Sequence, residues 1–229
     1  LASYGQIALP LAIADLPIVI YLTPFFGGDI GVNIQVLAWV LLGARLADVL
    51  IDPCIGILSD RSVNAPIGRR KLYILLGIPV KMLGIYMIMF AEPGVSWAYV
   101  LLWIIVFYLG LTMITIPYGA LGAELSNDYL QRTRITGWRA LFTFAGILIA
   151  TIAPLITGGG AGTAQGLTPV MQGLGLWSLI AFPISAFLIG CFVPEPPVRD
   201  SGAGVDWFKG LKVAAANGAF MRILGATVV

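Results

Sequence analysis

Six long apolar stretches alternate with short polar connections along this chain. They cover about residues 7–26, 34–58, 72–91, 97–121, 137–157 and 174–193. An α-helix needs about 20 mostly apolar residues to cross a bilayer, and each stretch reaches that length. The stretches are continuously apolar, whereas the strands of a membrane β-barrel alternate with a period of two. The pattern predicts an all-α integral membrane protein with six transmembrane helices, and a new apolar stretch near residue 220 predicts the start of a seventh.

The basic residues are distributed unevenly among the connections. Those after the second, fourth and sixth stretches carry Arg61, Arg69, Arg70, Lys71, Arg132, Arg134, Arg199, Lys209 and Lys212. The connections after the first, third and fifth stretches carry no Lys or Arg. Because cytoplasmic connections are enriched in these residues, the even-numbered connections and the N-terminus are predicted to be cytoplasmic.

Composition supports a chain surrounded by membrane lipid. Hydrophobic residues make up 59% and charged residues 10%, whereas a soluble domain carries about a quarter charged residues. The sequence has no histidine, and no metal-ligand cluster or nucleophile–base spacing indicates an enzyme. A net charge of +2 without a basic cluster argues against nucleic-acid binding. Cys54 and Cys191 lie inside apolar stretches and are predicted to be buried thiols.

The ends of the chain suggest a piece of a longer protein. The first residue is Leu1 instead of methionine, and the last residues lie in a fresh apolar stretch. We expect a six-helix bundle in residues 1–193, a cytoplasmic linker in 194–212, and the start of a C-terminal half in 213–229. Within the linker, Trp207, Phe208 and Leu211 could instead form an interfacial amphipathic helix. The missing half would be a partner supplied by the same chain or by another.

Charged side chains inside the apolar stretches are the first candidates for function. A charge at the bilayer centre costs about 2.5–3.5 kcal/mol on insertion scales, so charges at that depth usually face a bundle interior or a water-filled cavity. The residues concerned are Asp15, Arg45, Asp48, Asp52, Lys81 and Arg139. Lys81 lies too deep for its ammonium to reach the membrane surface easily. Arg139 either belongs to the cytoplasmic rim with Arg132 and Arg134 or donates hydrogen bonds to a substrate.

The second stretch carries a charged face. Arg45, Asp48 and Asp52 are spaced i, i+3 and i+7, which places them within about 60° of arc on a helix. Two carboxylates one turn apart repel each other, so one binds a proton or a cation lies between them. This predicts a site for Na⁺ or H⁺ and no other cofactor. The alternative is that Arg45 pairs with Asp48, while Lys81 or Arg139 pairs with Asp52, which would only join helices.

Several short motifs resemble a known family. The sequence GILSDR at 56–61, followed by GRRK at 68–71, resembles the connection between helices two and three of the major facilitator superfamily. The long spacer between them, ARLAD at 44–48 and DP at 52–53 are similar to the glycoside–pentoside–hexuronide:cation symporter branch, of the melibiose-permease type. TIPYGALGAEL at 115–125, RTR at 132–134 and WR at 138–139 also match that branch.

The resemblance implies a fold and a set of site residues. Members have twelve helices in two six-helix halves, with a small-molecule substrate held between the halves. We expect this chain in the bacterial inner membrane. The matching cation-binding residues are Asp48, Asp52 and Thr112. The candidate substrate-binding residues are Asp15, Lys81, Thr115 and Arg139. A cytoplasmic gate would comprise Asp60, Arg61, Gly68, Arg69 and Arg70, and Arg45 would take part in buried ion pairing.

Two departures from the family pattern leave the substrate open. Ala12 and Thr115 stand where sugar-transporting members carry sugar-binding acids, and Asp15 lies one turn beyond the first of these positions. Related branches carry lipids or other amphiphiles. The leading hypothesis is a secondary active transporter that couples a sugar or another small organic solute to Na⁺ or H⁺ by alternating access. The alternative is a structural or assembly subunit of a larger membrane complex that reuses the transporter fold without transport.

Overall fold

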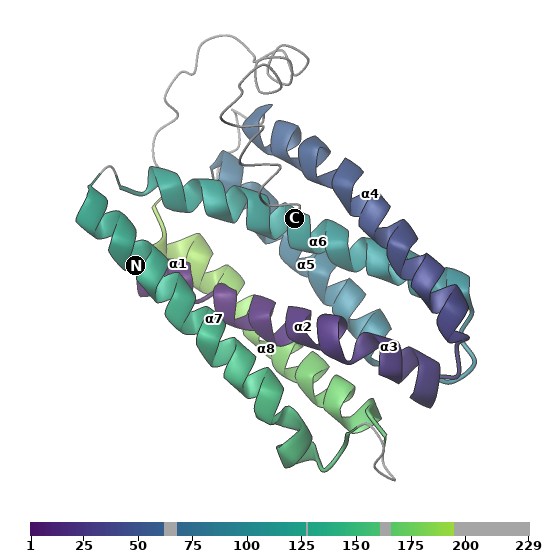
Figure 1. Cartoon of the computed structure of the whole chain (residues 1–229). Helices are drawn as coiled ribbons and strands as arrows, with labels where there is room; N and C mark the ends of the chain where they lie inside the picture. The colour runs from purple at the N-terminus through teal and green to yellow at the C-terminus, as the bar shows by residue number, and fades with distance from the viewer. Residues whose placement is uncertain (62–67, 127, 161–165, 195–229) are drawn as a thin grey trace, which may run out of the picture. The chain divides into compact units, whose positions relative to one another are not determined.

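The computed structural model describes residues 1–61, 68–126, 128–160 and 166–194, with the side chains of residues 60 and 61 left out. Within these ranges the regular structure is entirely helical (Figure 1). The elements are α1 (Ala2–Gly5), α2 (Ala8–Ile20), α3 (Leu22–Pro24), the π-helix η1 (Phe25–Asp29), α4 (Ile34–Arg61), α5 (Arg69–Met89), α6 (Trp97–Glu124), α7 (Tyr129–Thr157) and α8 (Thr168–Phe192).

The prediction of six membrane-crossing helices is confirmed within the described residues. Six helices are long and apolar enough to cross a bilayer, the first of them combining α1 and α2 over Ala2–Ile20. The other five spans correspond to α4, α5, α6, α7 and α8. The predicted linker and the start of a seventh helix lie outside the described residues.

The first span differs from its prediction, because it begins at Ala2 instead of residue 7 and is interrupted. The interruption falls at Gln6 and Ile7, just before Pro10. Proline has no amide hydrogen, and its ring clashes with the carbonyl four residues earlier, here that of Gln6. The Gln6 carbonyl instead accepts a hydrogen bond from the Leu9 amide at 3.1 Å, so the chain bends and continues as α2.

Three other predicted starts lie too far along the chain. α5, α7 and α8 begin at Arg69, Tyr129 and Thr168, where the hydropathy pattern predicts starts at 72, 137 and 174. Hydropathy follows contact with lipid, whereas a helix continues into the aqueous boundary wherever its backbone is hydrogen-bonded. The start of α7 illustrates this, because the Asp128 carboxylate caps it by accepting from the Leu130 amide at 3.3 Å.

Another carboxylate holds the beginning of α8. Asp29, at the end of η1, accepts hydrogen bonds from the amides of Leu167 at 2.6 Å and Thr168 at 2.8 Å. The hydroxyl of Thr168 donates to the same oxygen at 3.0 Å. Amide groups at a helix N-terminus lack partners within the helix and favour a negative charge. Asp29 therefore fastens the end of the first span to the sixth.

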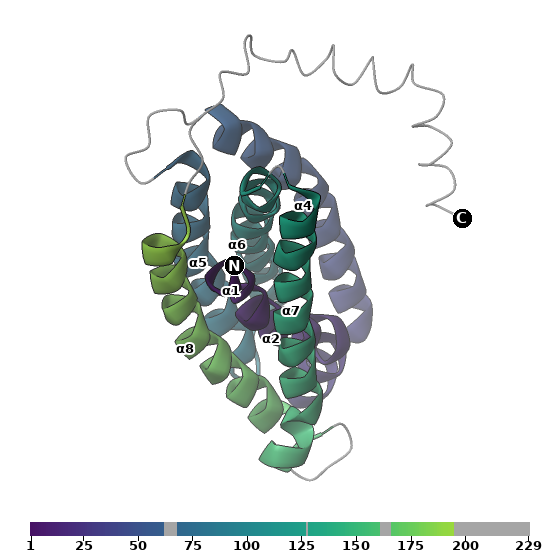
Figure 2. The same cartoon turned by 90° about the vertical axis from the view of Figure 1, so that its left-hand side faces the viewer.

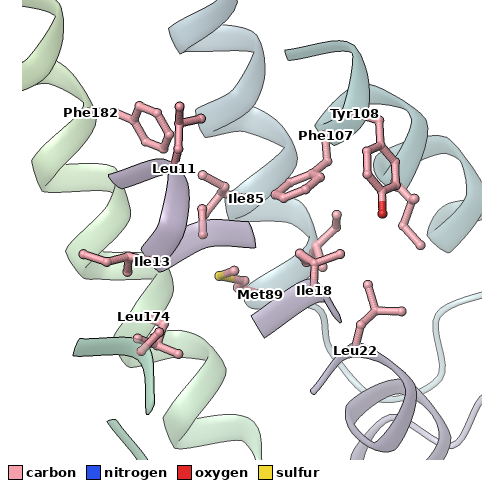
Figure 3. Close-up of a cluster of buried hydrophobic side chains, with 14 of the residues drawn as sticks. Leu11, Ile13, Ile18, Leu22, Ile85, Met89, Phe107, Tyr108, Leu174 and Phe182 are labelled. Carbon is pink, nitrogen blue, oxygen red and sulfur yellow. The ribbon is translucent and has the colours of Figure 1, made fainter. Parts of the chain in front are cut away.

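The first span lies at the centre of the bundle. α7 and α8 pack directly against α1 and α2, while α5 and α6 form the most extensive helix pair and α4 packs on α6 (Figures 1 and 2). Buried apolar side chains from α2, α5, α6 and α8 meet in the interior, among them Leu11, Ile85, Phe107 and Phe182 (Figure 3). In a bilayer such contacts stabilise a bundle chiefly through close packing and not through exclusion of water.

Two glycines allow unusually close helix contacts. A Cβ atom added to Gly110 on α6 would lie 2.5 Å from the backbone nitrogen of Lys81 on α5. One added to Gly146 on α7 would lie 2.6 Å from the Leu9 carbonyl oxygen and 2.7 Å from the Cβ of Ala12. Small residues of this kind let membrane helices touch backbone to backbone. These contacts fix the rotation of the helices that carry the candidate site residues.

α4 and α7 are the least covered spans. In each, 17% of the most apolar window is buried, against 56% in the first span. Large apolar side chains such as Trp39 on α4 and Leu155 on α7 are exposed.

Cys54 and Cys191 are exposed as well, so the prediction of buried thiols is wrong. An apolar stretch in a membrane helix identifies the span, but it does not say which side faces the bundle.

Candidate substrate and cation sites

α2, α6 and α7 line an open cavity of about 350 Å³. Its polar lining consists of Asp15, Thr115, Tyr118, Arg139 and Thr143, and its apolar lining of Ala8, Leu11, Ala12, Leu16, Val19 and Ile147. Three of the four predicted substrate-binding residues therefore line one cavity, which is within the size range of small-molecule sites.

The fourth, Lys81, lies behind the cavity as the partner of Asp15. Its ammonium nitrogen lies 2.6 Å from Oδ1 of Asp15 and has no exposed surface, whereas a third of the Asp15 side chain, 33%, is exposed. The same nitrogen lies 3.2 Å from the centroid of the Phe107 ring, a cation–π contact. Lys81 therefore pairs with Asp15, and the alternative prediction that it pairs with Asp52 is wrong.

Arg139 lines the cavity and is exposed. Because α7 begins at Tyr129, Arg139 lies nearly three turns inside the helix. Its guanidinium carbon lies 5.0 Å from the centroid of the Tyr118 ring on α6. Among the side chains that the structure describes, Arg139 makes no ion pair, which also removes the alternative pairing with Asp52.

Tyr4 supports this side of the cavity, although it was not predicted to be a site residue. Its hydroxyl donates to the carbonyl of Tyr118 at 2.7 Å, and the two rings stack with centroids 4.3 Å apart. Tyr4 is on α1, which the hydropathy pattern did not include in a helix. The two stacked rings hold Tyr118 against Arg139, so Tyr4 positions a cavity residue without touching the cavity.

The two carboxylates on the charged face of α4 meet one hydroxyl on α6. Thr112 Oγ1 lies 2.7 Å from Oδ1 of Asp52 and 3.5 Å from Oδ1 of Asp48. A threonine hydroxyl has one hydrogen, so it donates to one carboxylate at a time. In the described part of the chain, neither carboxylate has an ion pair. The two acids and Thr112, predicted from spacing and resemblance, therefore lie together and retain acceptor capacity for a cation or a proton.

The prediction of buried ion pairing for Arg45 is not met. Its side chain is exposed and forms no salt bridge with any side chain that the structure describes. The guanidinium instead lies over the ring of Tyr108 on α6, 4.8 Å from its centroid. Asp48 and Asp52 contact Thr112, whereas Arg45 contacts Tyr108. These residues share one face of α4, but they do not form a salt bridge with each other.

At the start of α5, basic residues meet an acid that was not predicted. Nη2 of Arg70 lies 2.6 Å, and Nη2 of Arg69 3.3 Å, from Oε1 of Glu124 at the end of α6. Gly68 precedes α5 with φ of 102°, a conformation that favours glycine. The side chains of Asp60 and Arg61 lie outside the described part. Glu124 is the acid near the end of the motif at 115–125, and that position could have identified it.

The described residues therefore form a helical bundle with an open cavity and with two carboxylates that share one hydroxyl. A model of the MFS/sugar transport protein family matches residues 3–229, and the chain belongs to this family. Membership agrees with the resemblance found in the motifs.

Several symporters are similar to this chain. The inner membrane symporter YicJ of Escherichia coli is 28% identical over 198 residues, covering 80% of this chain and 41% of YicJ. The uncharacterized symporter YnaJ of Bacillus subtilis is 32% identical over 142 residues, 59% of this chain and 30% of YnaJ. The sodium-dependent lysophosphatidylcholine symporter 1 of Xenopus tropicalis is 28% identical over 116 residues, 49% and 22% respectively. The chain spans less than half the length of these relatives.

Proposed function

We propose that the chain forms the N-terminal half of a symporter that couples a small organic solute to Na⁺ or H⁺. The observation that carries this proposal is the Asp48–Asp52 pair, which shares the hydroxyl of Thr112 and forms no salt bridge with any described side chain. A negative pair inside a membrane protein needs a mobile cation or proton to balance it. The sodium-dependent and cation symporters among the relatives support the same reading.

α6 provides the physical link between the two ligands. It carries Thr112 at the carboxylate pair and Thr115, one turn further along, at the cavity. A displacement of α6 by a bound cation therefore changes the cavity wall, and a substrate that moves the wall changes the carboxylate site. Such coupling is reciprocal, because each ligand alters the affinity for the other by the same factor.

Alternating access would follow from the charge of the pair. Closing a low-dielectric cavity around two carboxylates is costly, and a bound Na⁺ or H⁺ lowers that cost. Substrate would bind between residues 1–193 and a C-terminal half that begins near residue 213, and the halves would rock about it. The little-covered α4 and α7 supply apolar surface for that partner half.

The contact of Arg69 and Arg70 with Glu124 would serve as the cytoplasmic gate. It joins the start of α5 to the end of α6, on the side that the distribution of basic residues predicts to be cytoplasmic together with the N-terminus. Asp60, Arg61 and Gly68 belong to the same connection. Glu124 is partly exposed, so water can replace the arginines around its carboxylate when these contacts break and re-form during a transport cycle.

The test is gradient-driven uptake by the full-length protein in proteoliposomes. Sugars, organic anions and lysolipids are offered under an imposed Na⁺ or H⁺ gradient, with wild type, Asp52→Asn and the distant control Asp29→Asn compared. We expect wild type and Asp29→Asn to accumulate a solute, and Asp52→Asn to lose accumulation while still exchanging internal for external solute. Undiminished gradient-driven accumulation by Asp52→Asn would show that this carboxylate does not couple transport to the ion.

A further inference from the structure

We propose that the substrate is an organic monoanion with a largely apolar body, and that Lys81 determines this preference by cancelling the charge of Asp15. The inference rests on the proposed transport function and assigns the substrate class of its cavity. Three observations carry it: the charge of the lining, the enclosure of Lys81, and the larger share of apolar residues on the walls.

The described walls carry one unmatched charge, and it is positive. Asp15 and Arg139 are the charged lining residues, and Asp15 is already balanced by the ammonium of Lys81 at 2.6 Å. Arg139 has no ion pair among the described residues and presents its guanidinium beside the cavity. A guanidinium offers several N–H donors in a planar fork that matches a carboxylate with two parallel hydrogen bonds.

Lys81 cannot withdraw from this pairing. Its backbone is in close contact with Gly110, and its ammonium is enclosed between Asp15 and the Phe107 ring with no exposed surface. A lysine in this position has no route along which to extend to the membrane boundary. The charge of Asp15 is therefore balanced within the domain, so a substrate need not carry a positive charge to balance it.

Most of the remaining wall residues are apolar. Ala8, Leu11, Ala12, Leu16, Val19 and Ile147 supply only apolar contacts. Of the hydroxyl groups, that of Thr143 already donates to the Arg139 carbonyl at 2.9 Å, and that of Tyr118 is buried, which leaves Thr115. The close contact of Gly146 with Ala12 leaves no room there for a longer polar side chain. A sugar carries more hydroxyl groups than these walls can pair, and each unpaired group weakens binding. An apolar body joined to a single anionic group fits the walls better.

The experiment measures the binding of three probes to the purified full-length protein in the presence of Na⁺. Phenylacetate is an apolar anion, phenylacetamide is its neutral counterpart of similar shape, and glucuronate is a hydroxyl-rich anion. We expect phenylacetate to bind about tenfold more tightly than either of the others. Equal or tighter binding of phenylacetamide or glucuronate, or no binding of phenylacetate, would overturn the proposal.

Variants of the pair test the role of Lys81. Lys81→Met leaves the charge of Asp15 uncompensated, so the preference for phenylacetate over phenylacetamide should fall about tenfold. Adding Asp15→Asn removes that charge and should recover most of the preference. If Lys81→Met alone does not fold, the double variant still decides. A double variant that folds but has lost the preference would refute the charge-balancing role, because a purely structural defect does not select one probe over another.

Failure here is distinguishable from failure of the symport proposal. Ion-driven uptake of a neutral sugar would refute the anion preference and leave symport intact. Selective binding of phenylacetate with uptake that ignores every ion gradient would refute symport and leave the charge preference intact.

Discussion

Two carboxylate environments in this bundle differ in what balances their charge. Asp15 on α2 has a dedicated partner, because fully buried Lys81 places its ammonium 2.6 Å from the carboxylate. Asp48 and Asp52 on α4 share the neutral hydroxyl of Thr112, and no ion pair holds either of them in the described part of the chain. Both environments adjoin α6, yet among the described residues only the environment of Asp15 contains a salt bridge.

The difference indicates a division of roles. A carboxylate held by a fixed ammonium keeps one charge state, so it can shape a cavity but cannot report the presence of an ion. A carboxylate pair bound only to a hydroxyl changes its net charge whenever a proton or cation arrives. We therefore assign substrate selection to the first environment and ion coupling to the second, and the following experiments test that division.

The largest effect is expected from breaking the fixed pair. Lys81→Met should lower the free energy of unfolding of the full-length protein by about 2–3 kcal/mol, below the loss for a fully buried pair because 33% of the Asp15 side chain is exposed. Thermal and denaturant unfolding in detergent measure this change. Lys81→Met combined with Asp15→Asn should recover most of the stability, and no recovery would show that packing, not charge, dominates at Lys81.

The carboxylate pair should respond in the opposite way. Asp52→Asn removes repulsion, so unfolding in cation-free buffer should occur at an unchanged or slightly higher temperature. The stabilisation that wild type gains from Na⁺ or from lower pH should shrink, with apparent ion affinity about tenfold to a hundredfold weaker. Asp29→Asn, whose carboxylate caps α8 away from this site, should keep the ion response. A retained ion response in Asp52→Asn would remove the distinction between the two environments.

A smaller effect is expected at the shared hydroxyl. Thr112→Val keeps the shape but removes the donor that holds Asp52 at 2.7 Å, and apparent cation affinity should fall about tenfold. Thr112→Ser should retain most of the affinity. Thr151→Val is a matched control, because its hydroxyl bonds only within α7, to the Ile147 carbonyl at 2.8 Å. Equal affinities for Thr112→Val and Thr112→Ser would exclude a role for the hydroxyl.

Asp29 provides the smallest effect and a third kind of environment. Its carboxylate is satisfied by amide groups at the start of α8, so Asp29→Ala should cost about 1 kcal/mol of stability, as for other helix caps. Unfolding experiments should show this loss without any change in ion affinity. A change in ion affinity would mean that the α8 cap and the carboxylate pair are coupled, contrary to the division proposed above.

Hydropathy and helical spacing explain how much could be predicted. The six spans follow from apolar length, and the meeting of Asp48, Asp52 and Thr112 follows from a regular helix face and the family motif. The break before Pro10 and the early start of α7 escaped prediction, because they depend on backbone hydrogen bonds and capping and not on hydropathy.

Contacts between helices were the harder part. The pairing of Lys81 with Asp15 and the cavity position of Arg139 depend on how neighbouring helices are rotated, and that rotation is fixed by the contacts at Gly110 and Gly146. A single sequence does not indicate which neighbouring helix each glycine contacts. Glu124 and Tyr4 were missed for the same reason, since each acts on a residue far away in the chain.

The backbone contact at Gly110 also limits how this domain can move. Because α5 and α6 touch there without an intervening layer of side chains, they have nothing to slide across and should travel as one rigid piece. Spin labels placed on these two helices should then report the same separation whichever side of the membrane the cavity faces. Labels on α4 and α7 should instead report a separation that changes with the side of the membrane that the cavity faces.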